Sequence, residues 1–167
     1  MYNESPQGME PTKQRNIVTR RARREDLDQI IDLDEALTGV RKADYWSHAF
    51  EHYGRKPGER ALFVAEDGDD HRHLGAIAGE VGAWEFGSAP CGWIFAIQVD
   101  PAYRQGYVGT SLLQAILGVF RQAGITKVRT MISRDNHLLM AFFRSQGMMA
   151  GPYLELEMDL GSEGSGP

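Results

Sequence analysis

The sequence has little cysteine, no long apolar run and no excess of basic residues. Cys91 is the only cysteine among the 167 residues, so an intramolecular disulfide is impossible and a reducing compartment is the simpler expectation. The longest wholly apolar run is about five residues, at 93–97, whereas a membrane helix needs about 20. The polar N-terminus lacks the apolar stretch of a signal peptide. We therefore expect a cytoplasmic protein with no membrane partner.

The charge balance is acidic. There are 18 basic and 23 acidic side chains, a net charge of −5 and a pI near 5.5, which argue against a nucleic-acid partner because phosphate binding needs a basic face. With 42% hydrophobic and 25% charged residues, the composition is that of one ordinary globular domain. Residues 1–15 and 161–167 contain almost nothing to bury. We expect a disordered N-terminal segment, a single domain over 16–160 and a flexible tail.

The periodicity of the apolar residues predicts alternating strands and helices. Short β-prone runs indicate strands at 16–20, 61–65, 74–81, 93–99, 127–132 and 153–160. Apolar residues at three- and four-residue steps indicate helices from Asp26 to Gly39, over 43–53, over 108–122, and from a cap at Asp135 to Gln146. This order predicts an α/β (α+β) fold. Its central sheet is mixed and mostly antiparallel, with about six to seven strands, and about four helices flank it.

The most informative segment is 97–113, where a buried strand enters a glycine-bearing turn that opens a helix. Such a turn gathers backbone N–H groups at the positive end of a helix dipole, which favours an anion such as a phosphate. Glycines alone are a weak signal, because Gly106 and Gly109 are also what a plain strand-to-helix connection would use.

This segment resembles the acetyl-CoA-binding motif of the GCN5-related N-acetyltransferases (GNAT family), in which Arg or Gln is followed by two residues, Gly, one residue, and Gly or Ala. Arg104 takes the first position, Tyr107 the middle one and Gly109 the last. Tyr107 departs from the motif, since glycine there lets the backbone approach the pyrophosphate. Gly106, one residue earlier, is the glycine that would relieve backbone strain in the turn instead.

A second segment, 136–148, is similar to the family's motif Asn-x-x-Ala-x-x-Phe-Tyr-x-x-x-Gly-Phe, and Asn136, Phe142 and Gly147 match it. The resemblance covers 16–160 and implies a single acetyltransferase domain that uses acetyl-CoA as co-substrate. Read residue by residue, it implies that CoA is bound by Ile97, Gln98, Val99, Arg104, Gln105, Gly106, Tyr107, Val108, Gly109, Thr110, Asn136 and Phe142. Asn136 has a purely structural alternative as a helix cap.

Two positions that carry proton-transferring residues in relatives are inert here. Phe143 stands where many relatives have a tyrosine that protonates the thiolate, and Met131 stands where ribosomal-protein alanine acetyltransferases, to which the chain has some similarity, have a glutamate. Direct transfer still needs a neutral amine and an acid for the thiolate. Glu85 and Tyr153 are the catalytic candidates, against the simpler reading of a solvated carboxylate and a packed tyrosine.

The resemblance implies transfer of an acetyl group to a primary amine in a ternary complex. The acceptor is then an amine-bearing small molecule, a lysine or a protein N-terminus, and a homodimer is possible. One alternative is an acyl-CoA-binding regulatory module with weak or lost transfer. Another is a metal hydrolase, because His48, Glu51 and His52 fit the pattern H-x-x-E-H. A hydrolytic zinc site needs a third ligand, so we expect no metal.

Overall fold

The computed structural model describes residues 16–105 and 107–161, and these fall into two compact units. The first unit ends at Met131 and the second begins at Ile132. Across the described residues, none of the helices combines the length and the apolar character that crossing a membrane would require.

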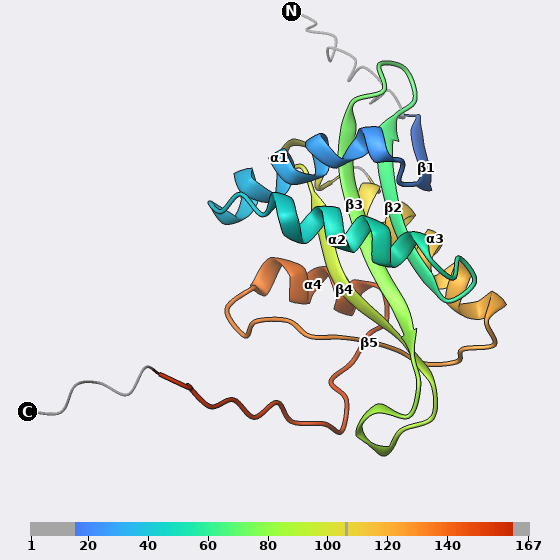
Figure 1. Cartoon of the computed structure of the whole chain (residues 1–167), viewed down its shortest axis with the longest axis vertical. Helices are drawn as coiled ribbons and strands as arrows, with labels where there is room; N and C mark the ends of the chain where they lie inside the picture. Colours follow the sequence, from blue (N-terminus) through green and yellow to red (C-terminus); the bar gives the residue numbers. More distant parts are fainter. Residues whose placement is uncertain (1–15, 106, 162–167) are drawn as a thin grey trace, which may run out of the picture. The chain divides into compact units, whose positions relative to one another are not determined.

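The first unit is built on one five-stranded sheet (Figure 1). The strands are β1 (Ile17–Arg21), β2 (Arg60–Asp67), β3 (His73–Gly82), β4 (Cys91–Val99) and β5 (Val128–Thr130), and they lie in that order. The pairs from β1 to β4 are antiparallel, whereas β5 runs parallel to β4. The predicted mixed, mostly antiparallel sheet is confirmed, with five strands rather than six to seven.

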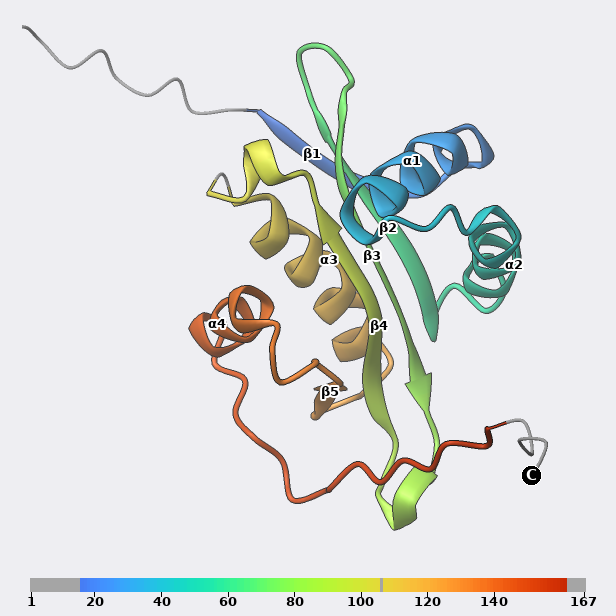
Figure 2. The ribbon, with the colours of Figure 1, turned by 90° about the vertical axis from the view of Figure 1, so that its left-hand side faces the viewer.

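Helices cover both faces of this sheet, as Figure 2 shows. On one face α1 (Leu27–Thr38) and α2 (Ala43–Gly54) bury their apolar stripes against β2 and β3. The core on that face consists of Ile30, Ile31, Trp46, Ala49, Tyr53, Leu62, Val64, Ala76 and Ala78. On the other face lies α3 (Val108–Gln122), the predicted helix with the predicted bounds. Its three- and four-residue apolar spacing is what packs it on a sheet.

Close approach of α3 to the sheet depends on two glycines. A methyl group on Gly79 would lie 2.8 Å from Ile116 Cδ1 and 3.2 Å from a ring carbon of Phe120, and one on Gly92 would overlap the Phe120 ring. Because side chains of α3 fill the space that these two residues leave, the helix is held against β3 and β4.

The second unit contains one helix, α4 (His137–Ser145), among its described residues. The side chain of Asn136 caps it, accepting a hydrogen bond from the Leu139 N–H at 3.1 Å, so the predicted cap at Asp135 is wrong by one residue. The predicted strand at 153–160 does not form, and its apolar side chains Leu154, Leu156, Met158 and Leu160 are exposed. Alternation describes only side chains, whereas a strand also needs a hydrogen-bonded neighbour.

Candidate functional site

The edge of β4 that faces β5 is paired over only part of its length. The register with β5 covers Gly92 to Ile94, and the hydroxyl of Thr130 then donates to the Ile94 carbonyl at 3.0 Å. Beyond this point β4 continues to Val99 along β3, but no strand among the described residues pairs with its other edge. Residues 95–99 therefore present a strand edge to which an extended ligand can add.

A β-bulge marks the place where β4 parts from β5. Ala78 of β3 pairs with Ala96 while Gly79 pairs with Ile94, so Phe95 is an extra residue with no partner in β3. Its side chain is 55% exposed. A bulge bends the strand and re-aims the side chain beside it. The regular sheet is therefore interrupted at the edge where an extended ligand would add.

The side chain of Gln98 turns away from any ligand on this edge. It is only 7% exposed, and its Nε2 donates to the carbonyl of Ile30 in α1 at 3.1 Å. Gln98 therefore ties β4 to α1, and only its backbone is available for the predicted pairing. On either side of it, Ile97 and Val99 are half-buried.

The turn after β4 is held by polar contacts that the sequence analysis did not single out. The Asp100 side chain accepts a hydrogen bond from the Ala102 N–H at 2.9 Å and so caps the short 3-10 helix Pro101–Tyr103. Arg72, from the turn between β2 and β3, donates to the Tyr103 hydroxyl at 2.6 Å. The Asp-Pro pair was the available signal, because Asp caps a turn and Pro fits its first position.

Tyr107 starts α3 in a conformation that glycine usually occupies. Its φ is +63° and ψ is 2°, its side chain is 80% exposed, and its carbonyl accepts from the Ser111 N–H at 2.8 Å. The Ser111 hydroxyl in turn shares a 2.6 Å hydrogen bond with Thr19 of β1. These contacts anchor the start of α3. The N–H groups of Val108 and Gly109 lie in its first turn, where no carbonyl of the helix is placed to accept a hydrogen bond from them.

The remaining predicted residues of this turn differ in exposure. Arg104 and Gln105 are exposed, Gly109 and Thr110 are half-buried, and Gly106 lies outside the described residues. The side chain of Val108 is buried at 1% exposure, so this residue can offer a ligand only its backbone. Together the turn presents main-chain donors with cationic Arg104 beside them in sequence, which suits a phosphate.

In the second unit, Asn136 and Phe142 have local roles in α4. The side-chain oxygen of Asn136 forms the cap described above, so the predicted capping role is observed, and its proposed contact with CoA stays a prediction. The half-buried ring of Phe142 lies 5.2 Å from that of Phe143, and Phe143 is 2% exposed.

The two catalytic candidates lie in different units. Glu85 is exposed in a short 3-10 helix between β3 and β4, where its carbonyl accepts from the Ser88 N–H at 3.1 Å. Tyr153 is half-exposed in the second unit.

The two histidines of the metal-peptidase pattern have other partners. His48 Nδ1 lies 2.7 Å from the Asp44 carbonyl, and His52 Nε2 lies 2.7 Å from Glu80. Throughout the described part of the chain, no group of three or more His, Cys, Asp or Glu residues is arranged to hold a metal ion.

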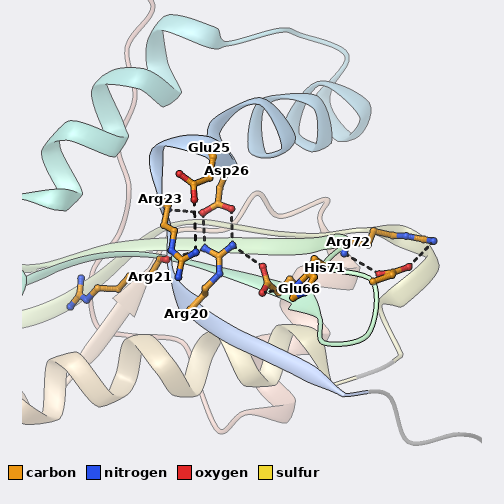
Figure 3. Close-up of polar contacts among 9 residues, drawn as sticks. Arg20, Arg21, Arg23, Glu25, Asp26, Glu66, His71 and Arg72 are labelled. Carbon is orange, nitrogen blue, oxygen red and sulfur yellow. Dashed lines mark hydrogen bonds and ion pairs between the residues drawn. The ribbon is translucent and has the colours of Figure 1, made fainter.

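A cavity in the first unit lies elsewhere, beside β1 and the start of α1. It measures about 540 Å³ and is lined by Val18, Arg20, Arg23, Glu25, Asp26, Gln29, Glu66, His71 and His73. The guanidinium of Arg20 donates to both oxygens of Asp26, at 2.8 and 2.9 Å, and to Glu66 at 2.7 Å (Figure 3).

Burial acts differently on the carboxylates and the histidine of this cluster. Burial alone would raise the pKa of Asp26, but hydrogen bonds from Arg20 and from the Arg23 N–H hold that pKa below its usual value. Burial acts to raise the pKa of Glu66, but the hydrogen bonds and charges of Arg20 and His71 together outweigh it and lower that pKa. For His73 the burial of the ring outweighs the attraction of nearby carboxylates, Asp26 foremost, and lowers its pKa to about 4.

Comparison with known proteins agrees with this architecture. The sequence profile described as the acetyltransferase (GNAT) family matches residues 27–148, so the chain belongs to that family. No curated protein sequence gave a match. Among solved structures, an aminoglycoside N-acetyltransferase in complex with CoA aligns with a TM-score of 0.74 and 17% identity, over 94% of this chain and 99% of that one.

Two further solved structures have the same fold. An aminoglycoside 6'-N-acetyltransferase from Acinetobacter baumannii aligns with a TM-score of 0.73 and 15% identity, covering 87% of this chain and 100% of that one. Glucosamine-6-phosphate N-acetyltransferase from Arabidopsis thaliana aligns with a TM-score of 0.68 and 17% identity, over 87% and 99%. The predicted family resemblance is confirmed, and the chain is a GNAT-type acetyltransferase by family and fold.

Proposed function

We propose that this acetyltransferase moves an acetyl group from acetyl-CoA to a primary amine by direct attack in a ternary complex. The observation that carries the proposal is the unpaired edge of β4 at 95–99, which leads into the first turn of α3. An extended arm with amide groups needs a free strand edge, and a phosphate group attached to that arm needs main-chain N–H donors just beyond the edge.

The proposed cofactor contacts follow from this geometry. The amides of the pantetheine arm pair with the backbone of Ile97 and Val99, as an added strand would. The pyrophosphate lies against the N–H groups of Val108 and Gly109, and Arg104 adds a charge-assisted contact. The left-handed backbone at Tyr107 supports our alignment of the motif, since it is the conformation for which a glycine is selected.

The chemistry requires the acceptor nitrogen to give up two protons and the CoA sulfur to take up one. The acceptor ammonium loses a proton, and its nitrogen then attacks the thioester carbonyl carbon. The new C–N bond forms, the nitrogen loses its second proton, the C–S bond breaks, and the CoA thiolate takes up a proton. Glu85, acting through water, is the candidate base on the β4 side, and Tyr153 is the candidate acid. Met131 is exposed and Phe143 is buried, and neither side chain can carry a proton.

The test combines CoA binding with turnover. CoA should raise the melting temperature, because a ligand that binds only the folded protein stabilises it by mass action. Gly109→Val should abolish this shift by crowding the first turn of α3, whereas His48→Ala on the exposed side of α2 should retain it. Acetyl-CoA with an amine should then release free thiol.

Two outcomes separate the alternatives. No thermal shift with CoA would overturn the proposal. A shift without amine-dependent thiol release would favour the acyl-CoA-binding regulatory module.

A cytoplasmic location and a homodimer remain predictions. The first follows from the single cysteine, and the second is to be checked by sedimentation.

A further inference from the structure

Three aromatic side chains form a row on the first unit, which we call the aromatic row: Phe86, Trp93 and Phe95. The Trp93 and Phe95 rings are nearly parallel, with an interplanar angle of 19° and centroids 6.3 Å apart, and Phe86 meets Trp93 edge-on at 6.2 Å. Phe86 is 73% exposed and Phe95 is 55% exposed. Exposed aromatic rings gathered in this way are typical of a binding surface rather than of a core.

The row leads to the point where chemistry would occur. Phe95 is the bulge residue and the first residue of β4 beyond its ladder with β5, so the row ends where the free strand edge begins. A thioester at the end of an arm laid along 97–99 would lie next to Phe95. The rest of the row extends from there toward the start of β4.

The loop that carries Phe86 has an unusual backbone. Trp84 has φ of +65°, Phe86 has +54° and Gly87 has +67°. Left-handed conformations at two bulky aromatic residues persist only where the surroundings impose them, and they concentrate at ligand sites. Here Arg129 donates to the Ser88 hydroxyl at 2.9 Å, and that hydroxyl bonds back to the Glu85 carbonyl at 3.0 Å.

The row already accommodates one cation and has a carboxylate beside it. The Arg129 guanidinium lies over the Trp93 ring, 5.8 Å from its centroid. A methyl group on Gly82 would lie 2.8 Å from Glu85 Oε2 and 3.0 Å from Trp93 Nε1, so the carboxylate and the indole border the same small space. Aromatic faces with an adjacent carboxylate favour an organic cation.

We propose that the aromatic row and Glu85 bind the acceptor, and that this acceptor is a primary amine carried on an apolar or aromatic body. The inference rests on the proposed transferase function and adds its substrate class. Glu85 supplies one carboxylate, while neighbouring Glu80 is already paired with Arg60 at 2.9 Å and with His52 at 2.7 Å. One carboxylate and three rings match a monoamine with an apolar body better than a polycationic, heavily hydroxylated one.

The test compares two monoamines of similar basicity, phenethylamine and ethanolamine, with acetyl-CoA as donor. Phenethylamine should be the better substrate by kcat/KM. Phe86→Ala and Phe95→Ala should each raise its KM about three- to tenfold, the range expected for a lost aromatic contact to a cation, and should leave the KM for acetyl-CoA unchanged. Trp84→Ala is the matched control, because Trp84 is equally exposed in the same loop but is not part of the row.

A second arm does not need turnover. Calorimetry of phenethylamine with the protein–CoA complex should show binding that Phe95→Ala weakens, and Phe95→Leu, which keeps an apolar side chain, should weaken it less. Equal use of both amines, or equal effects of Trp84→Ala and Phe95→Ala, would overturn the aromatic-row assignment while leaving the transferase function intact. If none of the amines tried gave thiol release, the transferase function itself would be overturned. If calorimetry then also showed no binding of phenethylamine, this inference would be overturned separately.

Discussion

Lowering the pH should destabilise this protein well before its carboxylates are protonated, because of His73. Burial depresses the pKa of His73 from 6.5 to about 4. Between these two values the unfolded chain binds a proton at this residue that the folded chain does not. Unfolding therefore takes up a proton, and the free energy of unfolding falls as the pH falls from about 6.5 towards 4.

The size of the effect follows from the shift. At about 1.4 kcal/mol for each unit of pKa, the full depression corresponds to about 3 kcal/mol lost across this window. That loss is a large fraction of the 5–15 kcal/mol that a typical domain has. Asp26 and Glu66 act at lower pH, because their depressed pKa values give stability that is lost only as those carboxylates take up protons.

The assay is urea unfolding followed by circular dichroism at several pH values between 7 and 4, on the natural protein and on His73→Asn. Asparagine is neutral and of similar polarity, so the variant should lose most of the pH dependence in this window. His48→Ala, which removes an exposed histidine, should keep it. If His73→Asn and the natural protein show the same dependence between pH 6.5 and 4, the buried neutral state inferred for His73 is wrong.

Three further predictions concern the same unit. Tyr107→Gly should raise the free energy of unfolding by about 1 kcal/mol, because glycine adopts the left-handed conformation without the strain of about 1–2 kcal/mol that other residues incur. It should also keep or tighten CoA affinity, and a tenfold loss of affinity by calorimetry would contradict our alignment of the motif. Asp26→Asn should lower the free energy of unfolding by about 2–3 kcal/mol, since it removes one of the two charged partners of Arg20, whereas Glu51→Gln at an exposed position of α2, measured in parallel, should change it little. Met131→Glu should raise turnover near neutral pH for basic amines by supplying a base, and its exposed position makes the substitution tolerable; an unchanged pH–rate profile would contradict this reasoning.

The sequence by itself determined most of the local elements and the order in which they follow one another. Apolar periodicity located α3 at 108–122 with its observed bounds, and the glycine-bearing turn before it indicated the end of the site for which we propose phosphate binding. These features were predictable because spacing along one chain decides which residues share a helix face or follow a strand.

Only the tertiary structure decided how those elements present their groups. The end of the β4–β5 ladder at Thr130, the bulge at Phe95 and the inward turn of Gln98 each depend on a partner far away in the sequence. The alternating pattern at 153–160 predicted a strand that does not form. Strand pairing, bulges and the burial of a polar side chain are fixed by which neighbours compete for the same hydrogen bonds, and local sequence contains no record of those neighbours.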